Sequence, residues 1–108
     1  MKERDLQHAC IKWVKEQRPD VLVVNIHGGG WSAKGFPDLI CCVNGLFVAV
    51  ELKVGDNTMQ SDQQIWRNRI VRAKGIHLCC TSLEQFQFFI DMFRQFNERE
   101  EGDTCENH

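Results

Sequence analysis

The sequence predicts one domain of the α/β (α+β) class, in which a mixed sheet is flanked by helices and the elements run in the order αβββαβα. Three segments repeat apolar residues at three- and four-residue steps, a spacing typical of amphipathic helices. Four short apolar runs separate these segments, and their lengths are typical of strands. A chain of 108 residues has the size of a single domain, so we expect one core.

The first helix is expected over residues 2–17. Its inward stripe comprises Leu6, Cys10, Trp13 and Val14. Pro19 cannot continue a helix and therefore marks its end. The β-branched run that follows, at residues 21–26, predicts the first strand.

A glycine-rich stretch at residues 27–35 favours a loop between this strand and a predicted hairpin. The hairpin comprises strands at residues 38–43 and 46–53, joined by Asn44-Gly45. That dipeptide favours the positive φ angles of a two-residue type I′ turn. We therefore expect the two strands to be antiparallel.

A second helix is expected over residues 60–74, with Gly75 ending it and a strand following at residues 76–80. The inward stripe of this helix comprises Trp66, Ile70 and Ala73.

The last helix is expected to be capped by Thr81 or Ser82, with Glu84 or Gln85 completing a capping box. Its apolar stripe comprises Phe86, Phe89, Ile90 and Phe93. Beyond it the chain becomes polar and acidic. We expect the domain to span residues 1–97 and residues 98–108 to form a disordered tail.

The composition favours a cytoplasmic protein. No apolar run approaches the roughly 20 residues that a membrane span needs, and the N-terminus lacks a signal-peptide pattern. Neither a disulfide framework nor a CxxC-type zinc spacing is present, so the cysteines are interpreted as buried free thiols. We expect no membrane partner and no small-molecule substrate.

The formal net charge of −2 excludes a strongly basic DNA-binding domain. The acids are unevenly distributed, however, because residues 98–108 hold five of them against Arg99 alone. Removing that stretch from the totals of 13 Lys and Arg and 15 Asp and Glu leaves 12 and 10. A local basic patch on the body of the domain is therefore compatible with the sequence.

The strongest chemical pattern is a pair of acids on the predicted hairpin. Asp38 opens one strand, and counting back from the turn pairs it near Glu51 on the other. Lys53 lies two residues after Glu51, so both side chains leave the same face of the strand. Two adjacent carboxylates repel each other unless a cation joins them, and oxygen ligands suit Mg²⁺ or Mn²⁺. The alternative is a surface hairpin with an ordinary ion pair.

Two further polar residues are expected to face inward from helices. Glu3 shares the stripe of the first helix, although an acid at a helix N-terminus also complements the helix dipole. Gln63 lies three residues before Trp66 and seven before Ile70, so it is expected on the inward face of the second helix. It is therefore favoured over Gln64, which points elsewhere. A buried glutamine requires hydrogen-bond partners, which a site at the hairpin would supply.

The set formed by Glu3, Gly35-Phe36-Pro37-Asp38, Glu51-Leu52-Lys53 and Gln63 resembles the VRR-NUC (virus-type replication-repair nuclease) domain of the PD-(D/E)XK nuclease superfamily. The resemblance covers approximately residues 1–95. It implies a restriction-endonuclease-like fold and a DNA endonuclease that uses Mg²⁺ or Mn²⁺.

Carried over by position, the resemblance makes Asp38, Glu51 and Glu3 metal ligands, with the main-chain carbonyl of Leu52 as a further ligand. Lys53 becomes the catalytic lysine and Gln63 a supporting residue. Short members of the family resemble phage or bacterial enzymes that act as homodimers on branched DNA such as four-way (Holliday) junctions. In larger relatives the domain occurs in DNA-repair nucleases.

The glycine-rich loop carries three candidate DNA contacts. The backbone at Gly29 could approach a phosphate, Lys34 could bind one, and Trp31 could stack on an exposed base. Alternatively, the three consecutive glycines form only a flexible connection.

Two other functions remain open at this point. One is a non-catalytic nucleic-acid-binding or assembly module that retains the nuclease fold; Lys53 argues against it, because metal binding alone needs no lysine. The other is an interaction domain that binds a protein through its phenylalanine-rich last helix.

Overall fold

The computed structural model describes residues 1–26 and 33–105, with side chains described as far as residue 95. Within that part of the chain the elements run in the predicted order αβββαβα. They are α1 (Glu3–Gln17), β1 (Leu22–Asn25), β2 (Leu39–Val43), β3 (Leu46–Leu52), α2 (Ser61–Arg72), β4 (Ile76–Cys80) and α3 (Leu83–Cys105). The predicted mixed α+β class is confirmed.

The four strands form one sheet in the order β1-β2-β3-β4. The pairs β1-β2 and β2-β3 are antiparallel, whereas β3 and β4 are parallel. Asn44 and Gly45 connect β2 to β3 with φ angles of 50° and 86°. Positive φ at both central residues is the signature of the predicted type I′ turn, which fixes the register of the hairpin.

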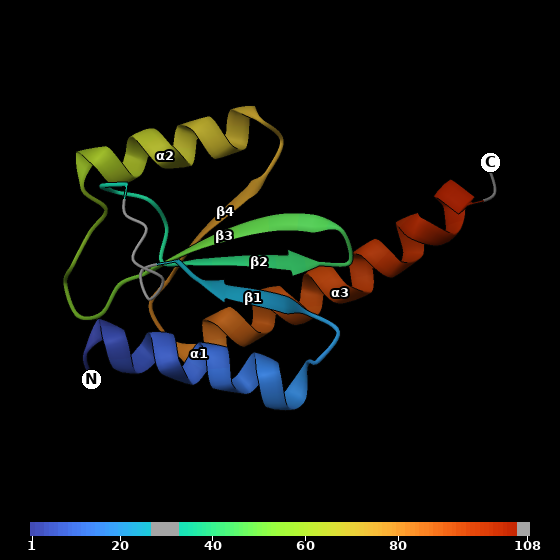
Figure 1. The fold of residues 1–108 in the computed structure, drawn as a ribbon, viewed down its shortest axis with the longest axis horizontal. Helices are drawn as coiled ribbons and strands as arrows, with labels where there is room; N and C mark the ends of the chain where they lie inside the picture. The colour runs from blue at the N-terminus through green and yellow to red at the C-terminus, as the bar shows by residue number, and fades with distance from the viewer. Residues whose placement is uncertain (27–32, 106–108) are drawn as a thin grey trace.

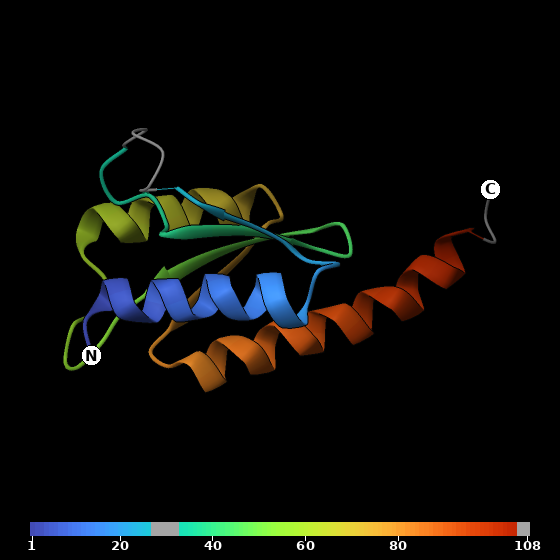
Figure 2. The ribbon, with the colours of Figure 1, turned by 60° about the horizontal axis from the view of Figure 1, so that its bottom comes forward.

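The helices cover the two faces of the sheet unequally. Helices α1 and α3 lie side by side on one face, and α2 lies on the other (Figures 1 and 2). Helix α2 contacts mainly β4. On that face of the sheet, α2 therefore does not cover β1 and β2. Leu22 and Val24 of β1 are exposed.

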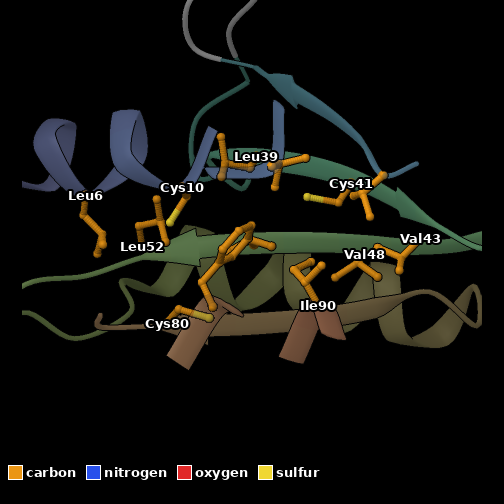
Figure 3. Close-up of a cluster of buried hydrophobic side chains, with 13 residues drawn as sticks. Leu6, Cys10, Leu39, Cys41, Val43, Val48, Leu52, Cys80 and Ile90 are labelled. Atoms are coloured by element: carbon orange, nitrogen blue, oxygen red, sulfur yellow. The ribbon is translucent and has the colours of Figure 1, made fainter. Parts of the chain in front are cut away.

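The core fills the space between the sheet and the pair α1 and α3 (Figure 3). Its members alternate along each strand, as a half-buried sheet requires. They include Leu6, Cys10, Leu39, Cys41, Val43, Val48, Leu52, Cys80, Phe86 and Ile90. The first and last predicted helix stripes therefore pack as expected, although Trp13 is only partly buried.

The interpretation of the cysteines as buried thiols is only partly correct. The five cysteines whose side chains the structure describes are free, and Cys10, Cys41 and Cys80 are buried. Cys42 and Cys79 are exposed, because adjacent strand residues point to opposite faces and only one face of the sheet carries the main core.

The structure decides between the alternative caps of α3. The Ser82 hydroxyl accepts a hydrogen bond from the Gln85 amide at 3.1 Å, so Ser82 is the cap. The side chain of Gln85 reaches back to accept the Thr81 amide at 2.7 Å. Helix α3 runs to Cys105, past the predicted boundary at residue 97, and the division of the chain there stays a prediction.

The end of α2 differs from the prediction that Gly75 stops it. Lys74 adopts the left-handed conformation, with φ of 73°, and its amide bonds the Val71 carbonyl. The Gly75 amide then bonds the Ile70 carbonyl at 2.9 Å, completing a Schellman motif. Gly75 is needed for space: a Cβ there would lie 2.9 Å from the Ile70 side chain and 3.0 Å from the Phe47 ring.

Replacing Lys74 with glycine is expected to stabilise the fold. Glycine adopts positive φ without the clash that costs other residues about 1–2 kcal/mol, although it also raises the entropy of the unfolded chain. We expect the free energy of unfolding to rise by about 0.5–1 kcal/mol. Urea denaturation measures this change. Lys12→Gly, at an exposed position in the interior of α1, is the control and should lower the free energy of unfolding. A fall for Lys74→Gly would contradict the assignment.

No helix in the described part of the chain combines the length and apolar character needed to cross a membrane. The cytoplasmic location stays a prediction.

Candidate metal centre

The hairpin places Asp38 and Glu51 side by side. The register pairs Leu39 with Val50, so the residues just before and just after these two are neighbours across the strands. Because Leu39 and Val50 face the core, Asp38 and Glu51 point to the other face, the one that carries α2. A carboxylate oxygen of Asp38 accepts the Leu52 amide at 2.8 Å, which fixes its position at the end of the ladder.

Glu51 is an acid in an unfavourable environment. Only 2% of the residue is exposed, and its Oε2 has no hydrogen-bond donor. The pKa of Glu51 is raised to about 8, first by burial and then by repulsion from and direct contact with the Asp38 carboxylate, while Lys53 acts to lower it. Since ionised carboxylates are both acceptors, the contact between the two acids requires a proton on one of them.

Gln63 holds the other oxygen of Glu51. It is the third residue of α2, and its Oε1 accepts the Gln60 amide at 2.8 Å at the start of the helix. Its amide nitrogen is therefore turned towards Glu51 and donates to Oε1 at 3.1 Å. The inward orientation predicted for Gln63 is what the structure shows, whereas Gln64 is exposed.

Replacing Gln63 with alanine is expected to lower the free energy of unfolding by about 1–3 kcal/mol, because a buried acceptor loses its donor and a helix start loses its cap. Gln64→Ala, one residue along on the exposed side, is the matched control and should change it by less than about 0.5 kcal/mol. Thermal unfolding of both variants measures the difference. Equal losses would show that Gln63 does not support Glu51.

Lys53 lies just past the end of β3, on the same face as Glu51. Only 7% of the residue is exposed, and its main-chain amide donates to the Cys80 carbonyl at 3.0 Å. Its charge acts on Glu51 and on Cys79, whose strand position pairs with Glu51. The ammonium group is therefore part of the same electrostatic cluster as the two acids.

Glu3 approaches this cluster without joining it. Its Oε2 accepts a hydrogen bond from the Asn57 side chain at 2.8 Å, and its charge contributes to raising the pKa of Glu51. Among the side chains that the structure describes, in residues 1–26 and 33–95, no three His, Cys, Asp or Glu side chains are close enough to hold one metal ion. Asn57 was not predicted from the sequence, because it lies in the loop between β3 and α2, and a loop residue gives no periodic signal.

The Asp38–Glu51 pair could hold a divalent cation. An added positive charge would remove the repulsion between the acids and supply the partner that Glu51 Oε2 lacks. The main-chain carbonyl of Leu52 is the remaining predicted ligand. Two carboxylates with open coordination positions suit Mg²⁺, which keeps several of its waters in proteins.

Of the three loop residues predicted to contact DNA, Gly29 and Trp31 lie outside the described residues. Lys34 is exposed, and its carbonyl accepts the Trp66 indole N–H at 3.1 Å. This bond ties the segment before Asp38 to α2. Trp66 was predicted only as part of a helix stripe, and Phe36 only as part of the Gly35-Phe36-Pro37-Asp38 motif. The two rings pack edge to face, with centroids 4.9 Å apart.

Comparisons with known proteins support the fold. No protein-family model and no curated protein sequence matches the chain. A solved structure described as a "VRR_NUC domain" is similar to it, with a TM-score of 0.65 and 21% sequence identity, over 82% of this chain and 94% of the other. The chain therefore has the fold of a VRR-NUC domain, as the motif resemblance predicted.

Proposed function

We propose that this protein is an Mg²⁺- or Mn²⁺-dependent DNA endonuclease that hydrolyses phosphodiester bonds. The observation that carries the proposal is the buried Glu51 beside Asp38, with an unpartnered carboxylate oxygen and a lysine on the same face. The fold shared with a VRR-NUC domain supports it. Two neighbouring buried acids lower the stability of the fold, so replacing them with uncharged residues would stabilise a protein in which they had no function.

In this proposal Asp38, Glu51 and the Leu52 carbonyl hold the cation. When bound, the cation supplies the positive charge that polarises the phosphodiester and favours hydroxide over water. Gln63 keeps Glu51 in place through its bond to Oε1, and the Leu52 amide does the same for Asp38. Glu3, whose carboxylate accepts a hydrogen bond from Asn57, is proposed as an additional ligand.

Lys53 is proposed to act on the phosphate. Its ammonium is held next to the two acids and is mostly buried, so its charge is poorly screened by water. A cation in that position stabilises the negative charge that builds on the phosphate oxygens during attack.

We further propose branched DNA, such as a four-way junction, as the substrate and a homodimer as the active form in DNA repair, replication or recombination. One chain of this size carries one site, and cutting two strands symmetrically needs a second copy related by a two-fold axis. Leu22 and Val24, which are exposed apolar residues on β1, are candidates for such a contact.

The test is cleavage of labelled four-way junction, flap and plain duplex DNA by the purified chain, with Mg²⁺, Mn²⁺ or EDTA. We expect cutting with either metal, none in EDTA, and a preference for the junction. Asp38→Asn should be inactive, while Asp5→Asn, on the exposed start of α1, should cut like the wild type. Binding of DNA and metal with no cleavage of any form would instead support a non-catalytic module.

A further inference from the structure

A second concave site lies on the same face of the sheet, between α2 and the tip of the β2-β3 hairpin. It is a cavity of about 590 Å³, within the range of pockets that bind small ligands. Three aromatic side chains line it, from three separate parts of the chain, and two cations stand at its margin. They are Phe36, Phe47, Trp66, Arg69 and Lys74.

The aromatic walls are held in place before any ligand arrives. Trp66 is fixed by its indole bond to the Lys34 carbonyl and by its edge-to-face contact with Phe36. Phe47 is 47% exposed, an unusual position for a phenylalanine on a strand, and Gly75 leaves the space its ring occupies. A flat ligand could therefore cover Phe47 without any rearrangement of the fold.

The charge around the cavity identifies the kind of ligand. The guanidinium of Arg69 stacks over the Trp66 ring, 4.4 Å from its centroid. Among the residues that the structure describes, no acid lines the cavity. Helix α2 and its C-terminal cap carry four cations, Arg67, Arg69, Arg72 and Lys74, against Asp62 alone. An apolar protein partner would bury these cations unpaired, at a high cost, whereas an aromatic anion would satisfy both the rings and the charges.

The cavity and the candidate metal centre share their supporting segments. Phe36 is two residues before Asp38, and Ile70, which lines the cavity, is seven residues after Gln63 on α2. Seven residues of helix span about 10 Å, the length of about three stacked nucleotides. One DNA strand could therefore reach both places.

We infer that this cavity binds an unpaired nucleobase of a DNA strand, with the adjoining phosphate on Arg69 and Lys74. The identity of the ligand as DNA rests on the proposed function. The cavity gives the protein a reason to prefer DNA that exposes an unpaired base, such as a bulge, over uninterrupted duplex. Stacking on aromatic side chains accepts any base, so no sequence preference is expected.

The test compares two labelled duplexes that differ only in one bulged nucleotide, thymidine in one and an abasic residue in the other, in EDTA. We expect the wild type to bind the thymidine bulge at least about five-fold more tightly, from the lower limit of about 1 kcal/mol for base stacking. Phe47→Ala should remove this preference, and Phe88→Ala, a more exposed phenylalanine on α3, should keep it. Circular dichroism checks that both variants are folded, and Phe47→Leu provides a smaller change at the same place.

A second pair of variants tests the phosphate contact. Arg69→Gln should weaken binding of both duplexes and flatten its salt dependence, while keeping the preference for the base. Arg72→Gln, on the same helix but not lining the cavity, should weaken binding less. Equal binding of the two bulges by the wild type, or a preference that survives Phe47→Ala, would overturn the inference. The inference would also be overturned if Phe47→Ala dissociated a dimer of the protein while the preference for the thymidine bulge stayed unchanged.

Failure of this inference and failure of the proposed function give different results. If base preference is found and no metal condition supports cleavage, the cavity is a DNA-binding site and the nuclease proposal is wrong. If the wild type cuts DNA but binds the two bulges equally, the nuclease proposal stands and the cavity does not bind a base.

Discussion

Glu51→Gln is expected to abolish DNA cleavage and, at the same time, to make the metal-free protein more stable than the wild type above pH 8. The pKa of Glu51 is about 8 in the fold, against an ordinary value near 4.5. Between these values the folded chain holds a proton that the unfolded chain releases. The stability contributed by this proton is therefore complete below pH 4.5. It falls by about 1.4 kcal/mol per pH unit between about pH 4.5 and 8, and none of it remains well above pH 8.

Glutamine keeps the shape of Glu51 and can still accept the Gln63 hydrogen bond, but it carries no charge at any pH. The two proteins should therefore unfold at similar temperatures near pH 5 in EDTA, and the variant should unfold at the higher temperature near pH 8.5. Saturating Mn²⁺ should raise the unfolding temperature of the wild type at pH 8.5 and leave that of the variant nearly unchanged. Glu16→Gln, an exposed acid on α1, is the matched control.

The stability measurement does not depend on activity. If Glu51→Gln follows the wild type at both pH values, Glu51 is not held as a neutral acid in the fold. If the variant is stabilised as expected but both proteins respond equally to Mn²⁺, the acids do not form the metal site.

Lys53→Met is expected to lower the cleavage rate by a factor of about 10²–10³ without weakening metal binding, because one preorganised charge at the phosphate is lost. Methionine preserves the buried aliphatic part of the side chain, so the fold should be retained. Removing a positive charge beside Asp38 and Glu51 should, if anything, tighten the binding of Mn²⁺. Calorimetric titration with Mn²⁺ and cleavage at saturating metal measure the two effects separately.

Lys12→Met removes a lysine from the exposed side of α1 and should leave both quantities unchanged. A Lys53→Met variant that cuts like the wild type would show that the lysine has no catalytic role. Weaker Mn²⁺ binding together with slower cleavage would assign it instead to positioning the acids.

Local rules in the sequence were sufficient for the elements and for the central pair of the site. The Asn44-Gly45 turn has one favoured geometry, and it sets the register that brings Asp38 opposite Glu51. Alternation along β3 then places Lys53 on the same face as Glu51. The orientation of Gln63 follows in the same way, because its distance from Ile70 on the helix puts it on the inward side.

What the sequence could not determine depends on contacts between distant segments. The parallel pairing of β4 with β3 brings Cys79 beside Glu51, and no local pattern specifies it. Glu3 accepts a hydrogen bond from Asn57, which lies 54 residues away in the loop between β3 and α2. Its assignment as a ligand therefore stays a prediction.

The difference between short-range signals and contacts of distant segments also explains why neither the aromatic cavity nor the raised pKa of Glu51 was predicted from the sequence. Periodicity and turn signals determined by themselves that the elements run in the order αβββαβα, with two acids and a lysine at the end of a hairpin, because turns and alternation are short-range. Only the tertiary structure decided how deeply Glu51 is buried, which raises its pKa, and that Phe36, Phe47 and Trp66 line one cavity. Burial and concave shape arise when α2 packs across the sheet, and that packing depends on the whole chain.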